Sequence, residues 1–459
     1  ICMINTSILV ILFIGFFASV TFNGFFRNIA KVNNILIDIP DKSRKFHFRA
    51  TPLTGGISIY IATLVSAILL SGLTNIPVEA NFSERGLIKD LDVYETSISR
   101  NYTVDNKNYE LELNQNNVDD SVSVNLDILD ENQSINVIKL DSGSFEVTLP
   151  DGSIEIYNYK NGNVSKASEN RELSPELNIL PSIKVDTTTL SMLICGALII
   201  AIMTIDDLYT IRASLRLFFQ SIIAITMIVL SGETVSNLGN LLGDGDIIMS
   251  KPLSIIFTVF CTVGIMNAYN MSDGLNGICA SFGLIPLIFI GFSGPVHYGT
   301  IILMGVLLGF LAYNLGWLGK KRRAFLGDSG SNSIGFAVAV LCIYYSQGYS
   351  ASGYIINPVT SLWLVAIPLL DCLGVIISRA IKGVMPFRPG RDHFHHKLLD
   401  LGFSPKQILL IFIFLSITLC SVGFILESIY ADKEYISFGL FIIFSIIFYT
   451  FTRRKISYV

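Results

Sequence analysis

Five polar clusters interrupt the apolar segments of this sequence, and their residue types could carry chemistry. The stretch NAYNMSDGLNG, from Asn267 to Gly277, holds three Asn, one Asp and two Gly between two apolar runs. A simple connecting turn would need only part of this set. The other four clusters are TIDDLYTIRASLR (204–216), FLGDSGSN (325–332), RPGRDHFHHKLL (388–399) and DIPDKSRKFHFRATPLTGG (38–56).

The residue types in these clusters fit the handling of phosphate groups. Carboxylates and Asn suit a hard cation such as Mg²⁺, which takes oxygen ligands and usually shares them with substrate phosphates. Arg, Lys and His bind phosphate oxygens through charge-assisted hydrogen bonds. Small Gly and Ser residues let backbone N–H groups approach an anion. Together these types indicate phosphoryl transfer, and the apolar surroundings indicate that one substrate is a lipid.

Each cluster also has an ordinary structural interpretation. Asp206 and Asp207 could form a solvated helix end, and Asp328 could cap the helix that follows it. The Asn-rich stretch could be a loop with left-handed Asn residues. The cluster of His393, His395 and His396 could bind either a metal or anions. The functional interpretation depends on all the clusters meeting on one face of a membrane.

The elements that must position these residues are membrane helices. The chain of 459 residues is 51% hydrophobic and only 15% charged, whereas soluble proteins average about 25% charged residues. Several apolar runs approach the length of about 18 residues that can cross a bilayer as a helix. We predict an all-α polytopic membrane protein with eleven spans, near residues 4–22, 56–73, 187–205, 214–231, 251–267, 278–293, 298–317, 333–347, 358–381, 406–427 and 435–452.

The distribution of Lys and Arg predicts the orientation of the spans. Basic residues gather after the first, seventh, ninth and eleventh spans, for example in KKRR at 320–323. Because cytoplasmic loops are enriched in Lys and Arg, we expect the N-terminus outside and the C-terminus inside. All five polar clusters then lie at the cytoplasmic face of the inner membrane.

Residues 74–186 differ from the rest of the chain. They contain 21 Asp and Glu against 9 Lys and Arg, a net charge of −12, while the whole chain carries −4. Alternating apolar residues in Ser121–Leu129 and around Pro-Asp-Gly in Ser144–Tyr159 indicate strands and a hairpin. We predict an extracytoplasmic β-rich insertion between residues 1–73, which form two spans and a cytoplasmic loop, and residues 187–459, which form the other nine spans and the catalytic loops.

The five clusters, in their order along the chain, resemble the motifs of the polyprenyl-phosphate N-acetylhexosamine-1-phosphate transferases, that is, glycosyltransferase family 4. The resemblance covers all eleven predicted spans but not the acidic insertion. Members often carry Asp where Asn276 stands here. The family motifs read here as Asn267-x-x-Asn270-x-x-Asp273-Gly274-x-x-Gly277, Asp206-Asp207, Gly327-Asp328-Ser329-Gly330-Ser331, Arg391-Asp392-His393-Phe394-His395-His396, and Arg44-Lys45-Phe46-His47 with Thr51-Pro52-Leu53-Thr54-Gly55-Gly56.

The resemblance implies roles for individual residues and a Mg²⁺ cofactor, with Mn²⁺ as an alternative ion. Asn270 and Asp328 would hold the metal. The catalytic residues implied are Asp206, Asp207, Asp273 and Asp328. The substrate-binding residues implied are Lys45, His47, Asn267, Asn276, Asn314, Arg388, Arg391, His393, His395 and His396.

The implied reaction transfers N-acetylhexosamine-1-phosphate, as GlcNAc-1-phosphate, from a UDP-sugar to undecaprenyl phosphate, releasing UMP and starting a lipid-linked cell-surface glycan such as O-antigen. The His-x-His-His loop favours this branch over the phospho-N-acetylmuramoyl-pentapeptide transferases of peptidoglycan synthesis, which typically carry three consecutive His. A membrane transporter is the non-enzymatic alternative, but it would spread polar groups through the membrane and across both faces. We expect membrane lipid and a second copy of the chain as partners, and no nucleic acid.

Overall fold

The computed structural model describes residues 6–39, 50–73, 187–291, 298–347, 356–385, 390–430 and 433–453, together with short strands between 97 and 166 and between 349 and 354. The chain divides into two compact units. One contains Ile1–Leu87 and Ile179–Val459, and the other contains Ile88–Asn178. Each unit is described separately below.

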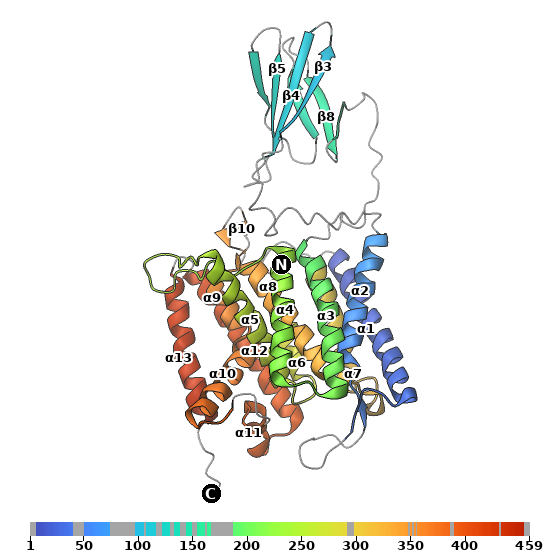
Figure 1. Ribbon diagram of the computed structural model, residues 1–459, viewed down its shortest axis with the longest axis vertical. Helices are drawn as coiled ribbons and strands as arrows, with labels where there is room; N and C mark the ends of the chain where they lie inside the picture. Colours follow the sequence, from blue (N-terminus) through green and yellow to red (C-terminus); the bar gives the residue numbers. More distant parts are fainter. Residues whose placement is uncertain are drawn as a thin grey trace. The chain divides into compact units, whose positions relative to one another are not determined.

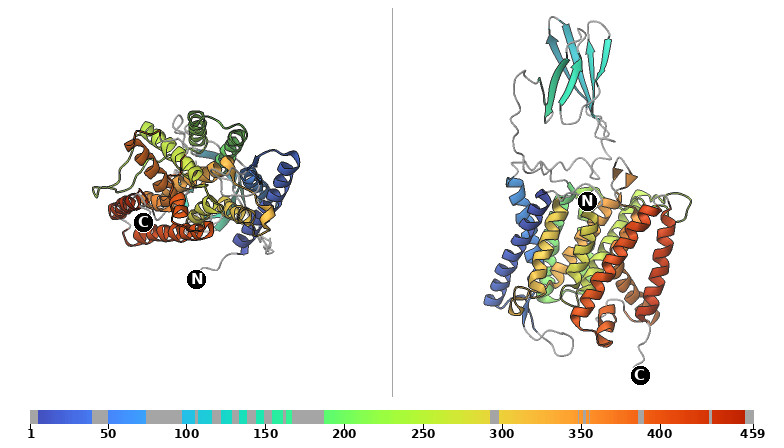
Figure 2. Two further views of the ribbon diagram at one scale, coloured as in Figure 1. Left: turned by 90° about the horizontal axis from the view of Figure 1, so that it is seen from below. Right: turned by 180° about the vertical axis from the view of Figure 1, so that it is seen from behind.

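The first unit consists of helices whose axes run broadly along one direction (Figures 1 and 2). Two short antiparallel strand pairs accompany them: β1 (Ile37–Asp38) with β2 (Thr51–Pro52), and β10 (Tyr349–Ser350) with β11 (Gly353–Tyr354). The helices are α1 (Thr6–Asn33), α2 (Gly55–Leu73), α3 (Thr187–Tyr209), α4 (Ala213–Ser231), α5 (Lys251–Ser272), α6 (Ile278–Gly291), α7 (Tyr298–Asn314), α8 (Gly327–Gln347), α9 (Pro358–Leu364), α10 (Ala366–Ile381), α11 (Phe394–Asp400), α12 (Pro405–Ile429) and α13 (Glu434–Arg453).

Many of these helices are long and apolar enough to cross a bilayer. Among the described residues, six pass this test, and α9 with α10 make a seventh if the pair counts as one span. Three more apolar helices are shorter: Gly55–Leu70 of α2, α6 and α7. The predicted class, a polytopic helical membrane protein, is therefore confirmed. The number of eleven spans and the orientation of the chain stay predictions.

One predicted span, near 358–381, is broken in the structure. Helices α9 and α10 meet at Val365 and are bent by 79° relative to each other. Pro368 explains the position of the break, because proline has no N–H to donate to the carbonyl four residues earlier, which belongs to Leu364. The bend turns α10 and its polar residues, Asp371 and Arg379, away from the direction of α9.

The core of the helical unit surrounds α6, α7 and α8, in which most side chains are buried. Helix α1 packs closely on α7 because glycines face each other there. A Cβ atom on Gly305 would lie 2.3 Å from the carbonyl oxygen of Leu12, and one on Gly15 would lie 2.6 Å from that of Ile302. Small residues let membrane helices approach at backbone distance and gain van der Waals contact.

The second unit contains two antiparallel sheets. The first has the order β3 (Ser97–Val104), β4 (Lys107–Gln115), β5 (Val122–Ile128) and β6 (Gln133–Val137). The second has the order β7 (Ser144–Thr148), β8 (Ile154–Lys160) and β9 (Asn163–Lys166). Strands β7 and β8 pair with Thr148 opposite Ile154, in the stretch where the sequence predicts a hairpin. The extracytoplasmic position of this unit and the domain boundaries stay predictions.

Candidate active site

The end of α3 and the start of α8 meet through an aspartate. Asp207 of α3 accepts hydrogen bonds from the backbone N–H groups of Asp328, at 2.8 Å, and Ser329, at 3.2 Å. These are among the first amides of α8, which have no partner within their own helix. A carboxylate there also interacts favourably with the helix dipole. Asp207 therefore caps α8 from another helix.

Gly327 makes this contact sterically possible. Its φ angle is +74°, and a Cβ atom would lie 2.8 Å from an oxygen of Asp207. The TPLTGG stretch supports the same turn, because Gly55 N donates to the carbonyl of Phe325 at 2.9 Å and Gly56 N to that of Leu326 at 3.1 Å. The TPLTGG and GDSGS motifs, distant in sequence, are thus packed together backbone to backbone.

Asp206 and Asp328 share one cation. The guanidinium of Arg216, in the first turn of α4, lies 3.0 Å from Asp206 and 3.3 Å from Asp328. Asp206 also accepts a bond from the N–H of Ile211 at 2.5 Å. The side chain of Asp206 is 2% exposed, whereas that of Asp328 is 39% exposed. Asp328 is therefore the more accessible of these two carboxylates.

Two Asn residues of α5 have different partners. Asn270 donates to Asp328 Oδ1 at 2.9 Å and to Ser331 at 3.0 Å, so it belongs to the carboxylate cluster. Asn267 donates to Gln220 of α4 at 2.8 Å, and Gln220 donates to Asn332 of α8 at 2.6 Å. This second chain of amides joins α4, α5 and α8 beneath the cluster.

Asn314 holds the loop that closes the NAYNMSDGLNG stretch. It is buried, it accepts a bond from the N–H of Gly277 at 2.6 Å, and it donates to the carbonyl of Ala324 at 3.0 Å. Its amide is therefore engaged with backbone atoms in this structure. Asn276, next to Gly277, is half-buried. Substrate contacts by Asn314 and Asn276 stay predictions.

The His-containing segment packs on the same stretch. A Cβ atom on Gly274 would lie 2.1 Å from Nε2 of His395, so only glycine leaves room for this ring. Burial, followed by the charges of Asp328 and Asp207, raises the pKa of the adjacent Asp273 to about 7. Asp273 is therefore close to Asp328 and Asp207. Because Gly274, the next residue in the chain, contacts His395, the His-containing segment lies beside the carboxylate cluster.

His393 and His395 are buried, and His396 is half-buried. Burial, and next the neighbouring His396, lowers the pKa of His395 to about 3. Without a ligand, burial therefore favours the neutral form of His395 at pH 7. Arg391 is exposed and pairs with Asp400 at 3.3 Å. Lys45, His47 and Arg388 lie outside the described residues.

The sequence reasoning missed four residues with polar contacts at or near this site: Arg216, Asp371, Arg379 and Arg453. Asp371 and Arg379 are charged residues within an apolar run, which is a signal for a functional or structural role. Arg216 and Arg453 gave no signal, since basic residues at cytoplasmic helix ends are common.

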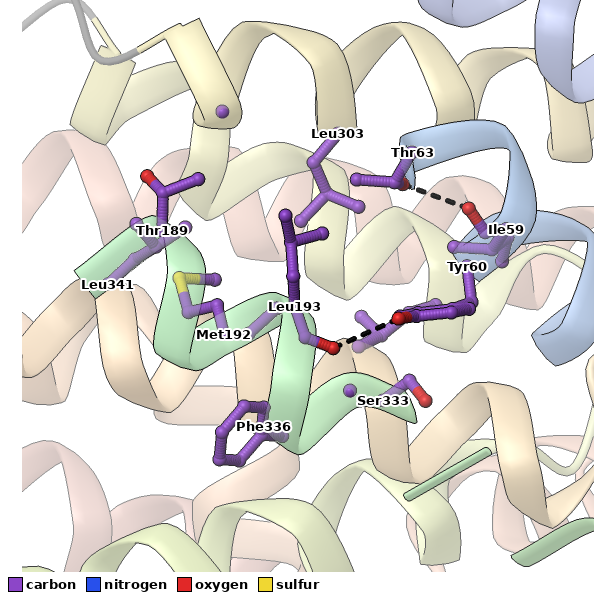
Figure 3. A pocket seen from close by; sticks show the side chains of 14 residues that line it. Ile59, Tyr60, Thr63, Thr189, Met192, Leu193, Leu303, Ser333, Phe336 and Leu341 are labelled. Atoms are coloured by element: carbon purple, nitrogen blue, oxygen red, sulfur yellow. Dashed lines mark hydrogen bonds between the residues drawn. The ribbon is translucent and has the colours of Figure 1, made fainter. Parts of the chain in front are cut away.

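A separate recess lies between α2, α3, α7 and α8, and its lining is mostly apolar (Figure 3). Tyr60 crosses it to donate a hydrogen bond to the carbonyl of Leu193 at 3.0 Å. Gly196, which also lines it, precedes Asp206 on α3 by ten residues, or about 15 Å of helix. Ser333, another lining residue, donates to the carbonyl of Ser329 at 2.7 Å, so the recess approaches the carboxylate cluster along α8.

These features define the class of protein: a multi-pass helical membrane protein with carboxylates, amides and histidines gathered at helix ends. The model of glycosyl transferase family 4 matches residues 189–346. The protein from Haemophilus influenzae is 35% identical over 263 residues, which cover 56% of this chain and 73% of that protein. The proteins from Yersinia pestis and Escherichia coli K12 are 30% and 31% identical over 258 residues, covering 55% of this chain and 69% of each relative.

All three relatives are named undecaprenyl-phosphate alpha-N-acetylglucosaminyl 1-phosphate transferase. The chain belongs to glycosyl transferase family 4.

Proposed function

We propose that this protein transfers GlcNAc-1-phosphate from UDP-GlcNAc to undecaprenyl phosphate and releases UMP. The relatives' names support this activity. The observation that carries it is a cluster from three helices, in which Asp206 and Asp328 both pair with Arg216 and Asn270 donates a hydrogen bond to Asp328. Such a cluster can hold a polyphosphate at helix ends, where one substrate comes from the membrane and the other from water.

The residues present fit a Mg²⁺ ion, with Mn²⁺ as an alternative. Among the residues that the structure describes, no three His, Cys, Asp or Glu side chains converge to hold a metal. Mg²⁺ usually needs only one or two carboxylates, because water and substrate phosphates complete its shell. Accessible Asp328 and neighbouring Asn270 would hold it. When bound, the ion would neutralise negative charge on the donor pyrophosphate.

The protein side chains have separate tasks in this reaction. Asp207 fixes the start of α8 and so positions Asp328. Arg216 offers a positive charge for phosphate oxygens between Asp206 and Asp328. A phosphate monoester with a second pKa of about 6 is mostly dianionic at pH 7, so its oxygen can attack without a general base. That oxygen attacks the β-phosphorus of the UDP-sugar, the bond from this phosphorus to the bridging oxygen breaks, and UMP leaves.

We place the reaction at the cytoplasmic face of the inner membrane, with eleven spans and the N-terminus outside. The accumulation of Lys and Arg after the first, seventh, ninth and eleventh spans supports this orientation. Self-association and the absence of a nucleic-acid partner stay predictions.

The test uses purified protein with undecaprenyl phosphate and three donors: UDP-GlcNAc, UDP-GalNAc and UDP-MurNAc-pentapeptide. We expect UMP release from UDP-GlcNAc only when both lipid phosphate and Mg²⁺ or Mn²⁺ are present. Exclusive use of the pentapeptide donor would assign the chain to peptidoglycan synthesis. Turnover of no donor, together with ion-coupled uptake into vesicles, would support a transporter. UMP release that EDTA does not affect would refute the requirement for a metal ion.

A further inference from the structure

A buried carboxylate on α10 holds the His-containing segment. Asp371 is 5% exposed and accepts hydrogen bonds from His393 Nδ1 at 2.9 Å and from the backbone N–H of Phe394 at 3.0 Å. The guanidinium of Arg453, the last residue of α13, lies 3.1 Å from the same carboxylate and also donates to the Asp371 carbonyl at 3.0 Å. Three parts of the chain thus meet at one aspartate.

A buried carboxylate is costly unless it is paired and its oxygens are hydrogen-bonded. Both oxygens of Asp371 meet this condition, one through His393 and the other through Phe394 and Arg453. A Cβ atom on Gly374, one turn further along α10, would lie 2.8 Å from the Arg453 guanidinium. The structure therefore leaves a specific space for the arginine of α13.

A second set of contacts ties the same segment to the same two helices. Arg379 of α10 is buried and pairs with Asp392 at 3.0 Å. Arg453 also donates to the carbonyl of Asp392, and Lys397 donates to the carbonyl of Thr452. Helix α11 and the end of α13 lie at the same end of the helical unit (Figure 1). Residues 391–397 are therefore held from both sides.

The contact with Asp371 fixes the chemistry of one histidine. Since Nδ1 of His393 faces a carboxylate, that nitrogen carries a proton, and Nε2 is left as the nitrogen for a ligand. The ring of His393 lies parallel to that of His395, with an interplanar angle of 7° and centroids 5.8 Å apart. His395 in turn packs on Gly274, beside the carboxylate cluster. The orientation of His393 is thus linked to the candidate active site.

We propose that Asp371, held in place by Arg453, is a positioning residue that sets the tautomer and orientation of His393 for binding the sugar-nucleotide donor. This inference rests on the proposed function for its substrate. It assigns a role in donor binding to α13, none of whose residues lies in a predicted site motif. The contact itself can be tested without any assay of turnover.

The kinetic test compares Asp371→Asn, Asp371→Glu and Arg453→Met with the unmodified protein. Asn keeps the size of the side chain but can turn its NH₂ group toward Nδ1, which favours the wrong tautomer, as for other His–Asp pairs. We expect Asp371→Asn and Arg453→Met to raise the KM for UDP-GlcNAc about tenfold or more, as loss of a charged hydrogen bond would. The KM for undecaprenyl phosphate should change less than twofold. Asp371→Glu should recover part of the loss.

The matched control is Asp244→Asn, the same chemical change at an exposed aspartate in the loop between α4 and α5. We expect it to change neither KM. Equal losses for both substrates in Asp371→Asn, accompanied by a lower melting temperature in detergent, would mean a purely structural role and would overturn the proposal.

The second test is independent of turnover. The ¹⁵N NMR spectrum of protein labelled at histidine distinguishes a proton on Nδ1 from one on Nε2, and His393→Gln identifies the signal of His393. We expect protonated Nδ1 in the unmodified protein and a change of tautomer in Asp371→Asn. An unchanged signal in Asp371→Asn would refute the positioning role even if the protein is an active transferase. If the protein turns over no UDP-sugar but Asp371→Asn changes the tautomer, the proposed function is wrong, while the effect of Asp371 on His393 is confirmed.

Discussion

The three aspartates at the end of α3 and the start of α8 differ in what their oxygen atoms contact. Asp207 uses both oxygens to accept backbone amides of α8, while Asp206 is almost fully buried and bonded to Ile211 and Arg216. Only Asp328 combines a partly exposed side chain with partners that a substrate phosphate could replace. At the residue scale, the oxygens of Asp206 and Asp207 are engaged by other parts of the chain, and Asp328 remains accessible from outside.

This difference predicts opposite effects for two similar substitutions. Asp207→Asn removes a charge from the start of α8 and places an NH₂ group against an amide, so we expect a loss of about 1–3 kcal/mol of stability. Asp328→Asn should cost less stability, because this side chain is 39% exposed, but it should lower UMP release at least a hundredfold, a typical size for loss of a charged active-site group. Melting temperatures in detergent and initial rates measure the two effects. Equal melting temperatures for the two variants would contradict the capping role of Asp207.

At the scale of elements, the broken pair α9 and α10 and the close pair α1 and α7 shape the helical unit. The bend at Val365 redirects α10, which carries Asp371 and Arg379 to the His-containing segment. The contact between α1 and α7 depends on Gly15 and Gly305 instead, and no predicted site residue lies in it. The first feature positions functional groups, and the second stabilises the fold.

The α1–α7 contact predicts the result of a glycine substitution. Alanine in a helix interior normally adds up to about 1 kcal/mol of stability over glycine. In Gly305→Ala the new Cβ would lie 2.3 Å from the Leu12 carbonyl, so we expect a net loss of about 1–3 kcal/mol from overpacking. Gly439→Ala in α13 is the matched control, because nothing lies within 4 Å of its Cβ position. A melting temperature of Gly305→Ala at or above that of Gly439→Ala would show that the helices can separate without cost.

At the scale of the whole molecule, the two units differ in what they contribute. Every predicted site residue that the structure describes belongs to the helical unit, whereas Ile88–Asn178 contains none. Helices α2 and α3, which flank this segment in the chain, contact each other directly through Tyr60 and Leu193. The helical unit therefore contains the contacts that assemble the candidate site.

We accordingly expect that a short Gly/Ser linker can replace Ile88–Asn178. Turnover of UDP-GlcNAc by the shortened protein should stay within a few-fold of that of the full chain, because the linker leaves the described site residues and both helices intact. The measurement is UMP release per mole of purified, monodisperse protein. A shortened protein that melts like the full chain but releases no UMP would mean that the segment acts on the site.

The sequence by itself determined the class of protein and most of the residues of the candidate site. Long runs of Leu, Ile and Phe form helices in an apolar medium because a helix satisfies its own backbone hydrogen bonds. Asp328 and Asn270 could also be identified from the sequence, because polar residues next to apolar spans usually have a functional role. The family resemblance, carried by short motifs, is confirmed by relatives that are 30% identical or more.

Only the tertiary structure decided which polar side chains meet. Asp207 is 121 residues from the amide that it caps, and Arg453 is 82 residues from Asp371. No periodicity or motif encodes such pairs, because they depend on how helices pack after each has formed. The sequence therefore did not indicate that Asp207 caps α8, and it left out Asp371, Arg216 and Arg453; the catalytic role of Asp207 stays a prediction. Their contacts follow from the packing, since a charged side chain at the end of a membrane helix or inside the protein pairs with whichever group the packing brings near it.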